Sequence, residues 1–446
     1  MNIRRIVSFL LLMAILGLCL ASCSDAGGKD DSTAATTTEV TEAPEDAILL
    51  YDGEEVKLQM VVPEGSGKEL TTAFFDLKAK LEDIIGEKIK NKDDFARDDE
   101  IKSAKDEILV GRTNRPATKE ALESISLKMT YTVVVNKNGV VLVGNSLGLT
   151  LKAIEYFADE YLPQNLVKSG EAYYIKCGAY VGEEEKDASF VSYAVMYYLA
   201  GEEFKYDTAT EYLTIPRIEG HYIQQGACLD DKGKYAYFAL RDKNDNCSIA
   251  KYDFTTKELI MTKANVGANH ANDMCYNPNN NTVLISNCTN FPTVVSIYNA
   301  DDLSLIRHKD IGLSNSAIDY NAKRNQYVIC GGGQITILDE NFKKVRSFKT
   351  QPVIHVSQGM NCDDEYIYCF QSDNTKNNEE AVGNVIYIYD WDGNFIFKMK
   401  FPDISTRRTM EAETMMNYGS DLYAVCYDQK NKCGVVHKMT FTVPEQ

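Results

Sequence analysis

The stretch His270-Ala271-Asn272-Asp273-Met274-Cys275-Tyr276-Asn277-Pro278, followed by three Asn residues and by Thr282-Val283-Leu284-Ile285-Ser286-Asn287, decides the fold. It predicts a short strand, a polar turn and a second, apolar strand. The same phrase returns at 225–240, 316–330, 358–370 and 413–426. A hairpin phrase that recurs about every 45 residues has the period of propeller blades. We therefore expect residues 211–446 to form an all-β propeller, five-bladed because the phrase occurs five times.

The two ends of this region predict how the ring closes. The last blade, 413–441, contains three strands, whereas Tyr212–Ile218 reads as an outer strand without a blade of its own. We expect the early strand to pair with Val435–Phe441 and complete the last blade. A sixth blade built from Phe190–Leu199 is the alternative, although that segment lacks the turn signal.

The N-terminus predicts export and a lipid anchor. Arg4 and Arg5 precede the apolar run Ile6–Leu18, as in a signal peptide, and the run is too short for a permanent span. The Leu20-Ala21-Ser22-Cys23 sequence that follows resembles the lipobox of bacterial lipoproteins. The resemblance implies that residues 1–22 are removed and that Cys23 carries two acyl chains, which anchor the protein to the extracytoplasmic side of the cell membrane. An ordinary secretory signal is the alternative.

The composition and net charge limit the classes of partner that the protein can bind. Residues 23–46 have almost no large apolar side chains and read as a flexible tether. The chain of 446 residues has 65 acidic and 47 basic side chains, a formal net charge of −18. This excludes nucleic-acid binding through a general basic field, and favours cations and basic surfaces among charge-driven partners.

The cysteines have two interpretations. Ten follow Cys23, and an even count in an exported protein is typical of a disulfide framework. However, five of them lie inside apolar strand phrases, where they would act as small buried hydrophobes: Cys228, Cys275, Cys330, Cys369 and Cys426. We expect mostly free, buried thiols, with a minority of cross-strand disulfides as the alternative. No Cys-x-x-Cys or Cys/His pattern with zinc spacing is present.

Residues 47–181 predict a small α/β domain, and 182–210 a transition segment. We expect a hairpin over 48–62 around Asp52-Gly53, helices over 68–86, 116–126 and 149–162, a buried strand at 107–111, and a hairpin over 131–143. The Glu107–Pro116 stretch resembles the α/β domain that precedes the barrel in bacterial glycoside hydrolases of the hexosaminidase and α-glucuronidase groups. That domain carries no catalytic residues there, and no barrel sequence follows here, so the resemblance does not imply hydrolase activity.

Within the predicted propeller, three short stretches resemble a known group of proteins: His270–Asp273, Ser357–Met360 and Glu411–Glu413. They resemble the five-bladed propellers grouped with helveticin-J-like and teichoic-acid-biosynthesis-C-like proteins. Propellers host many unrelated functions, so the resemblance implies a fold and no activity.

The candidate site follows from the propeller, because the first strand of each blade lines the central channel. Aligning the phrases places Asp273 and Glu413 at equivalent positions, both pointing into the channel. The candidate binding residues at this mouth are Gln225, His270, Asn272, Asp273, His355, Gln358, Glu411 and Glu413.

Four interpretations of this site compete. The side chains suit a sugar or another polyol, a Ca²⁺ ion, or glycoside cleavage by paired carboxylates. They also suit a plug in which the polar groups bond to one another.

We expect a membrane-anchored extracellular lipoprotein that recognises a glycan or cell-wall polymer without catalysis. The alternatives are a glycosidase or lyase with its site in the channel mouth, and a scaffold for protein partners. The His-Glu-x-x-His and Gly-x-Ser-x-Gly signatures are absent. Two inward-pointing carboxylates at an open cleft would favour the enzyme hypothesis. A closed channel, in which the polar groups bond to one another, would favour the scaffold hypothesis.

Overall fold

The computed structural model describes residues 43–206, 210–351, 357–371, 385–400 and 410–441. The predicted signal peptide, Cys23, most of the tether and the candidate residue His355 lie outside these ranges. Within the described residues, no helix is both long and apolar enough to cross a membrane.

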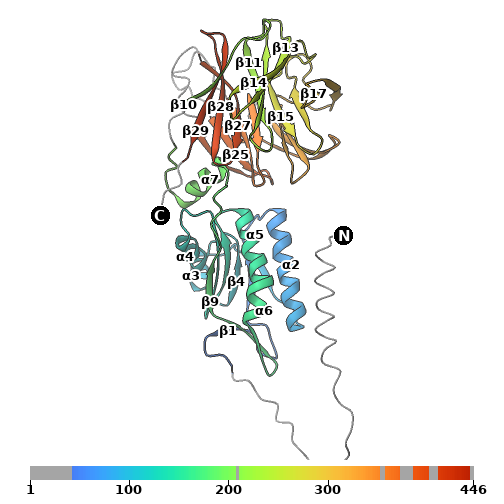
Figure 1. Ribbon diagram of the computed structural model, residues 1–446. Coiled ribbons are helices and arrows are strands. Elements are labelled where there is room, and N and C mark those ends of the chain that lie inside the picture. The colour runs from blue at the N-terminus through green and yellow to red at the C-terminus, as the bar shows by residue number, and fades with distance from the viewer. Residues whose placement is uncertain (1–42, 207–209, 352–356, 372–384, 401–409, 442–446) are drawn as a thin grey trace, which may run out of the picture. The chain divides into compact units, whose positions relative to one another are not determined.

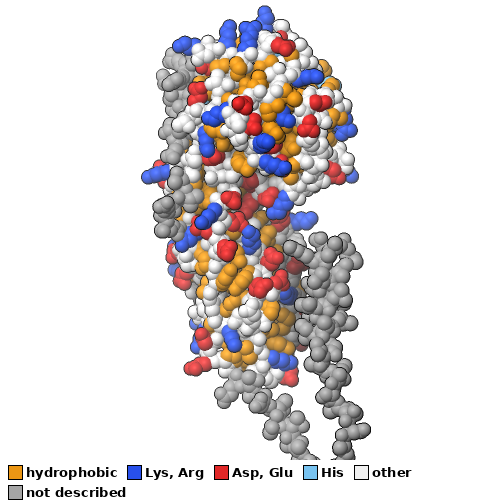
Figure 2. Space-filling view, viewed as in Figure 1, with side chains coloured by type: hydrophobic (Ala, Val, Ile, Leu, Met, Phe, Trp, Pro, Cys, Tyr) orange, Lys and Arg blue, Asp and Glu red, His pale blue; other side chains and the backbone are white. Residues whose placement is uncertain are grey.

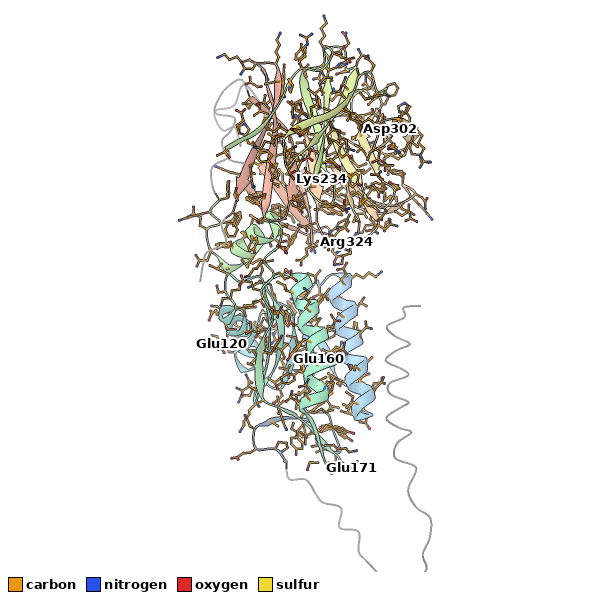
Figure 3. The ribbon with its side chains drawn as sticks, in the orientation of Figure 1. Glu120, Glu160, Glu171, Lys234, Asp302 and Arg324 are labelled. Atoms are coloured by element: carbon orange, nitrogen blue, oxygen red, sulfur yellow. The ribbon has the colours of Figure 1, made fainter. Side chains whose placement is uncertain are left out.

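The N-terminal region is an α/β unit built on a six-stranded mixed sheet. The strand order is β3-β2-β4-β6-β5-β9, and the bounds are β2 (Gln59–Val62), β3 (Asn91–Asp93), β4 (Glu107–Val110), β5 (Tyr131–Asn136), β6 (Gly139–Gly144) and β9 (Gly178–Val181). A second, three-stranded sheet joins β1 (Ala47–Tyr51) to β8 (Ala172–Lys176) and β7 (Leu166–Ser169). Figure 3 shows Glu171 at the tip of the β7–β8 hairpin.

Helices cover both faces of the larger sheet (Figure 1). α2 (Lys68–Ile85) and α5 (Leu147–Tyr156) lie side by side on one face, and α3 (Asp98–Ser103) and α4 (Pro116–Ser124) lie on the other. The helix expected over 68–86 is confirmed: its buried residues follow helical spacing, and Gly86 ends it with φ of 79°. The α5 helix continues through a π-helical turn (Phe157–Tyr161) into α6 (Leu162–Asn165).

The hairpin expected over 48–62 is wrong. The Asp52-Gly53 turn does form, and the Lys57 N–H donates to the Leu50 carbonyl at 2.9 Å. Beyond it, β1 and β2 enter different sheets, because β2 pairs in parallel with β3 and β4. The apolar residues of β2 are buried within the larger sheet's core, which outweighs the local turn preference.

The C-terminal region contains five four-stranded antiparallel sheets among the described residues, an architecture consistent with a β-propeller. Four are formed by consecutive strands: β11 (Ile223–Leu229), β12 (Tyr235–Arg241), β13 (Cys247–Asp253) and β14 (Glu258–Lys263); β15 (Asp273–Asn277), β16 (Thr282–Ser286), β17 (Val294–Asn299) and β18 (Leu305–Asp310); β19 (Ala317–Asn321), β20 (Gln326–Gly331), β21 (Gln334–Asp339) and β22 (Lys344–Lys349); and β23 (Gly359–Cys362), β24 (Tyr366–Gln371), β25 (Val385–Asp390) and β26 (Phe395–Lys400).

The fifth sheet joins the two ends of this region. Its order is β10 (Thr210–Ile215), β29 (Cys433–Thr440), β28 (Asp421–Asp428) and β27 (Met410–Tyr418), and Figure 1 shows these strands side by side. The β10–β29 register runs antiparallel from Thr210 opposite Lys438 to Ile215 opposite Gly434. The predicted closure is therefore confirmed. The inner strands β11, β15, β19, β23 and β27 each contact the next, and β27 contacts β11.

The alternative strand over Phe190–Leu199 is wrong, because this segment is helix α7 (Phe190–Ala200). Ser189 begins it by accepting a hydrogen bond from the Ser192 N–H, and Gly201 ends it with φ of 75°. Its residues from 190 to 197 are all buried, and they share a hydrophobic core with residues of β24, β25, β27, β28 and β29. An apolar run buried on every side gives no helical periodicity for sequence reasoning to detect.

The expectation of free thiols is confirmed in the described residues. All ten cysteines there are free, and seven of them are buried. The five in the strand phrases pack in the apolar layers between sheets, as small hydrophobes do.

Candidate functional site

Asp273 lies at the centre of the inner strands and is fully buried. Its Oδ2 accepts hydrogen bonds from the N–H groups of Ile318 at 3.1 Å and Met360 at 3.0 Å, and its Oδ1 accepts from the Thr414 hydroxyl at 2.8 Å. One carboxyl on β15 thus joins β19, β23 and β27. Burial raises the pKa of Asp273 well above its ordinary value, and the three donors offset part of that rise.

The neighbouring polar groups are also satisfied inside the protein. Asn272 Nδ2 donates to the carbonyls of Ser316, Ser357 and Gln358 at 2.5, 3.1 and 3.2 Å. Gln225 is 3% exposed, and its Nε2 donates to a backbone carbonyl at 2.6 Å. At this level the channel is a self-bonded plug, and the geometry of Gln225, Asn272 and Asp273 does not support ligand binding by these side chains.

The predicted equivalence of Asp273 and Glu413 is wrong. β27 carries a β-bulge between Ala412 and Thr414, and Glu413 is the extra residue. Thr414 therefore contacts Asp273 in its place, because a bulge shifts the register by one residue. Glu413 is buried near Glu411 and Gln225; burial, with a smaller contribution from Glu411, raises its pKa well above the usual value.

His270 and Glu411 lie at the same end of the inner strands as Glu413. His270 Nδ1 is 3.2 Å from Asp245 Oδ1, and Arg241 Nη1 is 3.1 Å from the same oxygen. Burial, and then the Arg241 charge, lower the pKa of His270. Glu411 accepts a hydrogen bond from the Gln429 side chain at 3.2 Å. The structure therefore brings several predicted site residues together, each with a partner inside the protein.

A cavity of about 350 Å³ opens at the opposite ends of the inner strands. We call it the turn-end cavity, because its residues end each inner strand or begin the turn that follows. Its polar lining consists of carboxylates, amides and phenols: Asp230, Asp231, Asp319, Asn361, Asn417, Tyr276, Tyr320 and Tyr418. Cys228 and Cys362 are among the remaining lining residues. This combination of hydrogen-bonding groups and aromatic rings is typical of small-ligand sites.

Two side chains define the chemistry of the turn-end cavity. The Asp319 Oδ2 accepts a hydrogen bond from the Cys362 N–H at 2.7 Å, and burial raises the pKa of Asp319 to about 6. Asn361 is 5% exposed, and within the described residues its buried Oδ1 has no hydrogen-bond partner. A buried polar atom without a partner is costly, so this oxygen favours a ligand or a water that donates to it.

Sequence reasoning missed this cavity because it considered only the starting residues of the inner strands. The available signal was an Asp or Asn near the end of several strand phrases, as in Leu229-Asp230-Asp231, Ile318-Asp319 and Met360-Asn361. For the calcium alternative, no three His, Cys, Asp or Glu side chains in the described ranges come close enough together to hold a metal ion.

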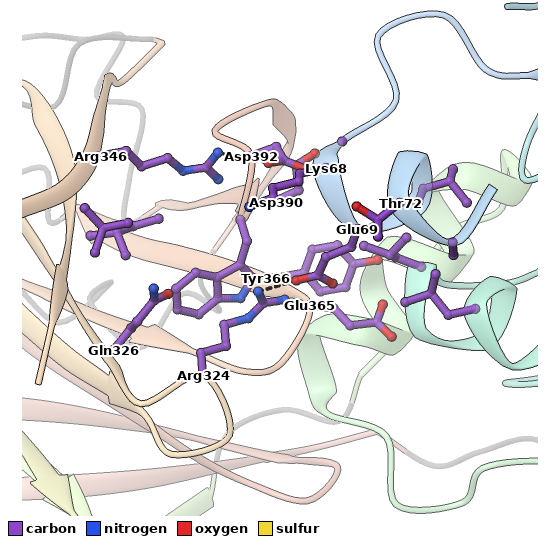
Figure 4. Close-up of a pocket in the computed structure, with 18 of the residues that line it drawn as sticks. Lys68, Glu69, Thr72, Arg324, Gln326, Arg346, Glu365, Tyr366, Asp390 and Asp392 are labelled. Carbon is purple, nitrogen blue, oxygen red and sulfur yellow. Dashed lines mark hydrogen bonds and ion pairs between the residues drawn. The ribbon is translucent and has the colours of Figure 1, made fainter. Parts of the chain in front are cut away.

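A larger cleft, of about 900 Å³, lies between the N-terminal ends of α2 and α5 and the turns of the third and fourth sheets (Figure 4). Its charged groups are mostly paired. Arg324, in the turn between β19 and β20 (Figure 3), forms an ion pair with Glu69 of α2, and Arg346 lies 2.9 Å from Asp392. Trp391 in its lining donates from Nε1 to the Asp363 carbonyl at 2.9 Å.

Acidic side chains of the fourth sheet meet three helix N-termini around this cleft. Glu365 Oε1 accepts from the Ser146 hydroxyl at 2.6 Å and from the Gly148 N–H at 3.1 Å, at the start of α5. Asp363 Oδ2 accepts at 2.7 Å from Ser189, the N-cap of α7. Asp392 lies against Gly67, the N-cap of α2, where a Cβ would be 1.7 Å from a carboxylate oxygen. Carboxylates are favoured at helix N-termini. We therefore interpret the cleft as a joint, that is, as part of the interface between the α/β unit and the C-terminal sheets.

The surface is chemically mixed. Figure 2 shows acidic and basic side chains interspersed over the visible face, and Leu259, Ile260, Leu305 and Ile306 of the outer strands β14 and β18 are exposed.

No protein-family model matches this chain, and no curated protein matches it. Among solved structures, it is similar to hydrazine synthase from Kuenenia stuttgartiensis, with a TM-score of 0.31 and 12% identity over 47% of this chain and 59% of that chain. It is also similar to a chain of a nidogen/laminin complex, with a TM-score of 0.34 and 12% identity over 49% of this chain and 80% of that one. The propeller-like architecture rests on the sheets of this chain and not on these weak likenesses.

Proposed function

We propose that this chain is a membrane-anchored extracytoplasmic lipoprotein, and that its five-bladed propeller recognises a glycan in the turn-end cavity without chemical turnover. The observation that carries the proposal is the lining of that cavity, above all the Asn361 Oδ1, which lies beside the Asp319 carboxyl and has no hydrogen-bond partner among the described residues. Sugar hydroxyls donate to such acceptors, and tyrosine rings provide faces for the apolar side of a sugar.

One feature, the closed channel, supports binding over hydrolysis. Glycosidases need two carboxyl groups that flank the scissile bond. In the cavity, Asp230 is engaged by the N–H groups of Lys234 and Tyr235 at 2.7 and 3.0 Å; Asp231 and Asp319 remain, so the assay for released sugar tests hydrolysis there. At the other end of the channel, Asp273 is closed off by its own partners.

The anchor and the N-terminal domain complete the proposal. The lipobox at Leu20–Cys23 supports lipidation of Cys23, and the segment that follows supports a flexible tether. Residues 47–181, which resemble a non-catalytic accessory domain, would then act as a spacer. The Cys23→Ala variant is expected to leave the membrane fraction or to remain unprocessed; a processed, membrane-bound variant would reject the anchor.

Glycan binding is tested on an array with purified protein, alongside an assay for released sugar. Asn361→Ala and Tyr418→Ala should each weaken binding about tenfold, the effect of losing one good contact. Tyr198→Ala is the matched control, because Tyr198 is 51% exposed, against 47% for Tyr418, and is absent from the lining. Unchanged affinity in both cavity variants, or sugar release by the parent, would reject the proposal.

A scaffold for protein partners is the second candidate function. The self-bonded plug favours it, and so do the exposed apolar residues Leu259, Ile260, Leu305 and Ile306. Replacing Ile260 and Ile306 with Asp separates the two candidates. If the turn-end cavity is the functional site, this double variant should bind glycan as the parent does. If the outer strands are the functional site, the double variant should lose its association with protein partners.

A further inference from the structure

The turn-end cavity presents acceptors without a cation to balance them. Among the residues that the structure describes, its lining includes Asp230, Asp231 and Asp319 but no Lys, Arg or His. Lys232 and Lys323 directly follow lining residues in the sequence but are outside the lining, and the Lys323 ammonium lies 3.1 Å from Asp364 Oδ2. A ligand that fits this lining must therefore donate hydrogen bonds and not merely accept them.

Asn361 gives independent support for a ligand. Asn361 is 5% exposed, and its buried Oδ1 has no hydrogen-bond partner among the described residues. It is also beside Asp319, which it helps to hold through a side-chain hydrogen bond. Two adjacent acceptors, one a carboxyl group, match a group that carries several N–H donors and a positive charge.

We propose that the ligand of the turn-end cavity carries a free amine, as in a glucosamine-type sugar, and that its ammonium group binds Asp319 and Asn361. This inference rests on the proposed glycan-binding function and names its substrate class. An ammonium has three donors and no acceptor, so it satisfies both oxygens. N-acetylation would remove the charge and add a carbonyl acceptor facing acceptors. A phosphate polymer would place anions next to three aspartates.

The environment of Asp319 leaves its charge for the ligand. The groups that face it are Tyr320 N–H and, from β23, Asn361 and Cys362. The Asp319 charge also reaches the thiols of Cys228 on β11 and Cys275 on β15 and the phenol of Tyr368 on β24. Burial raises the pKa of each well above its ordinary value, so these groups remain neutral. Burial sets the pKa of Asp319 at about 6. Amine binding should therefore strengthen as pH rises from 5 through about 6, and weaken again as pH approaches about 8, where an amine with electron-withdrawing neighbours loses its proton as an α-amino group does.

The test is titration calorimetry of the purified full chain with three probes: a glucosamine tetramer, its fully N-acetylated counterpart and poly(glycerol phosphate). The parent should bind the amine tetramer about tenfold or more tightly than the acetylated one. Asp319→Asn should abolish that preference and its pH dependence. Asp302→Asn, in an exposed turn, is the matched control. Should Asp319→Asn fold poorly, Asp231→Asn, at an exposed position, should still reduce the preference.

The outcomes separate this inference from the proposed function. Equal or tighter binding of the acetylated tetramer, or binding of poly(glycerol phosphate), overturns the amine inference and leaves glycan recognition standing. Absence of binding to all three probes and to the glycan array overturns both. An amine preference that survives Asp319→Asn and Asp231→Asn overturns the assignment to this cavity.

Discussion

Replacing Asp273 with Ala should destabilise the propeller more than any other single polar substitution at the channel. The change leaves two buried backbone N–H groups, of Ile318 and Met360, without an acceptor, and removes the partner of the Thr414 hydroxyl. An unsatisfied buried donor costs about 1–3 kcal/mol. The hydroxyl can turn to another acceptor, so the two amides dominate, and the loss is about 2–6 kcal/mol.

Asp273→Asn separates hydrogen bonding from charge. The Asn oxygen still accepts from both amides, and its NH₂ donates to the Thr414 oxygen. Burial raises the pKa of Asp273, so the carboxyl contributes its full stability below its ordinary value of 3.8 and loses it as pH rises. The Asn variant lacks this dependence, and its stability relative to the parent should therefore increase between pH 4 and pH 8.

Thermal unfolding followed by circular dichroism at several pH values is the assay. For domains of this size, 1 kcal/mol corresponds to about 2–4 °C, so Asp273→Ala should lower the Tm by at least about 4 °C. Asp273→Asn should stay close to the parent at pH 4 and match or exceed it at pH 8. The reasoning fails if the Ala variant keeps the parental Tm, or if the Asn variant loses as much as the Ala variant.

Three further predictions concern the ring and the joint. Gly226→Ala places a Cβ 2.7 Å from the Asp273 backbone and should cost about 1–3 kcal/mol, visible as a lower urea midpoint; an unchanged midpoint would contradict the close packing. Deleting residues 210–215 should expose the edge of β29 and cause self-association measurable by light scattering, and a stable monomer would show that β10 is dispensable. Burial raises the pKa of Glu365 to about 7, so its contribution to stability falls as pH rises from about 4.5 to about 7. Glu365→Gln should flatten the Tm profile over that range, and a profile parallel to the parent's would remove the role of this carboxyl.

Sequence reasoning located the propeller because its signals are local and repeated. Each hairpin phrase combines an apolar strand with an Asn-, Asp- or Gly-containing turn, and five copies reinforce one another. The closure by β10 was also predictable, since the last phrase lacks one strand and the early strand lacks a sheet. Both inferences need only strand count and periodicity.

The site was less predictable because it depends on register and packing. The bulge at Glu413 has no composition signal, yet it moves that carboxyl out of line with Asp273. Residues 190–197 of helix α7 are all buried, so their apolar run was consistent with a strand as well. The volume of the turn-end cavity depends on the spacing between five strands and on the size of the side chains at their ends. No single segment of the sequence determines that spacing.

The plug and the cavity are physically linked, which explains why the buried carboxyl does not need to touch a ligand. Asp273 fixes β15 against β19, β23 and β27, and the close approach of Gly226 fixes β11 against β15. The ends of these same strands supply Asp319, Asn361 and the tyrosines of the cavity. A binding site built from several strands is only as well defined as the spacing between them. Variants that keep the hydrogen bonds of the plug should therefore keep ligand affinity, whereas variants that break them should weaken binding even when the propeller remains folded.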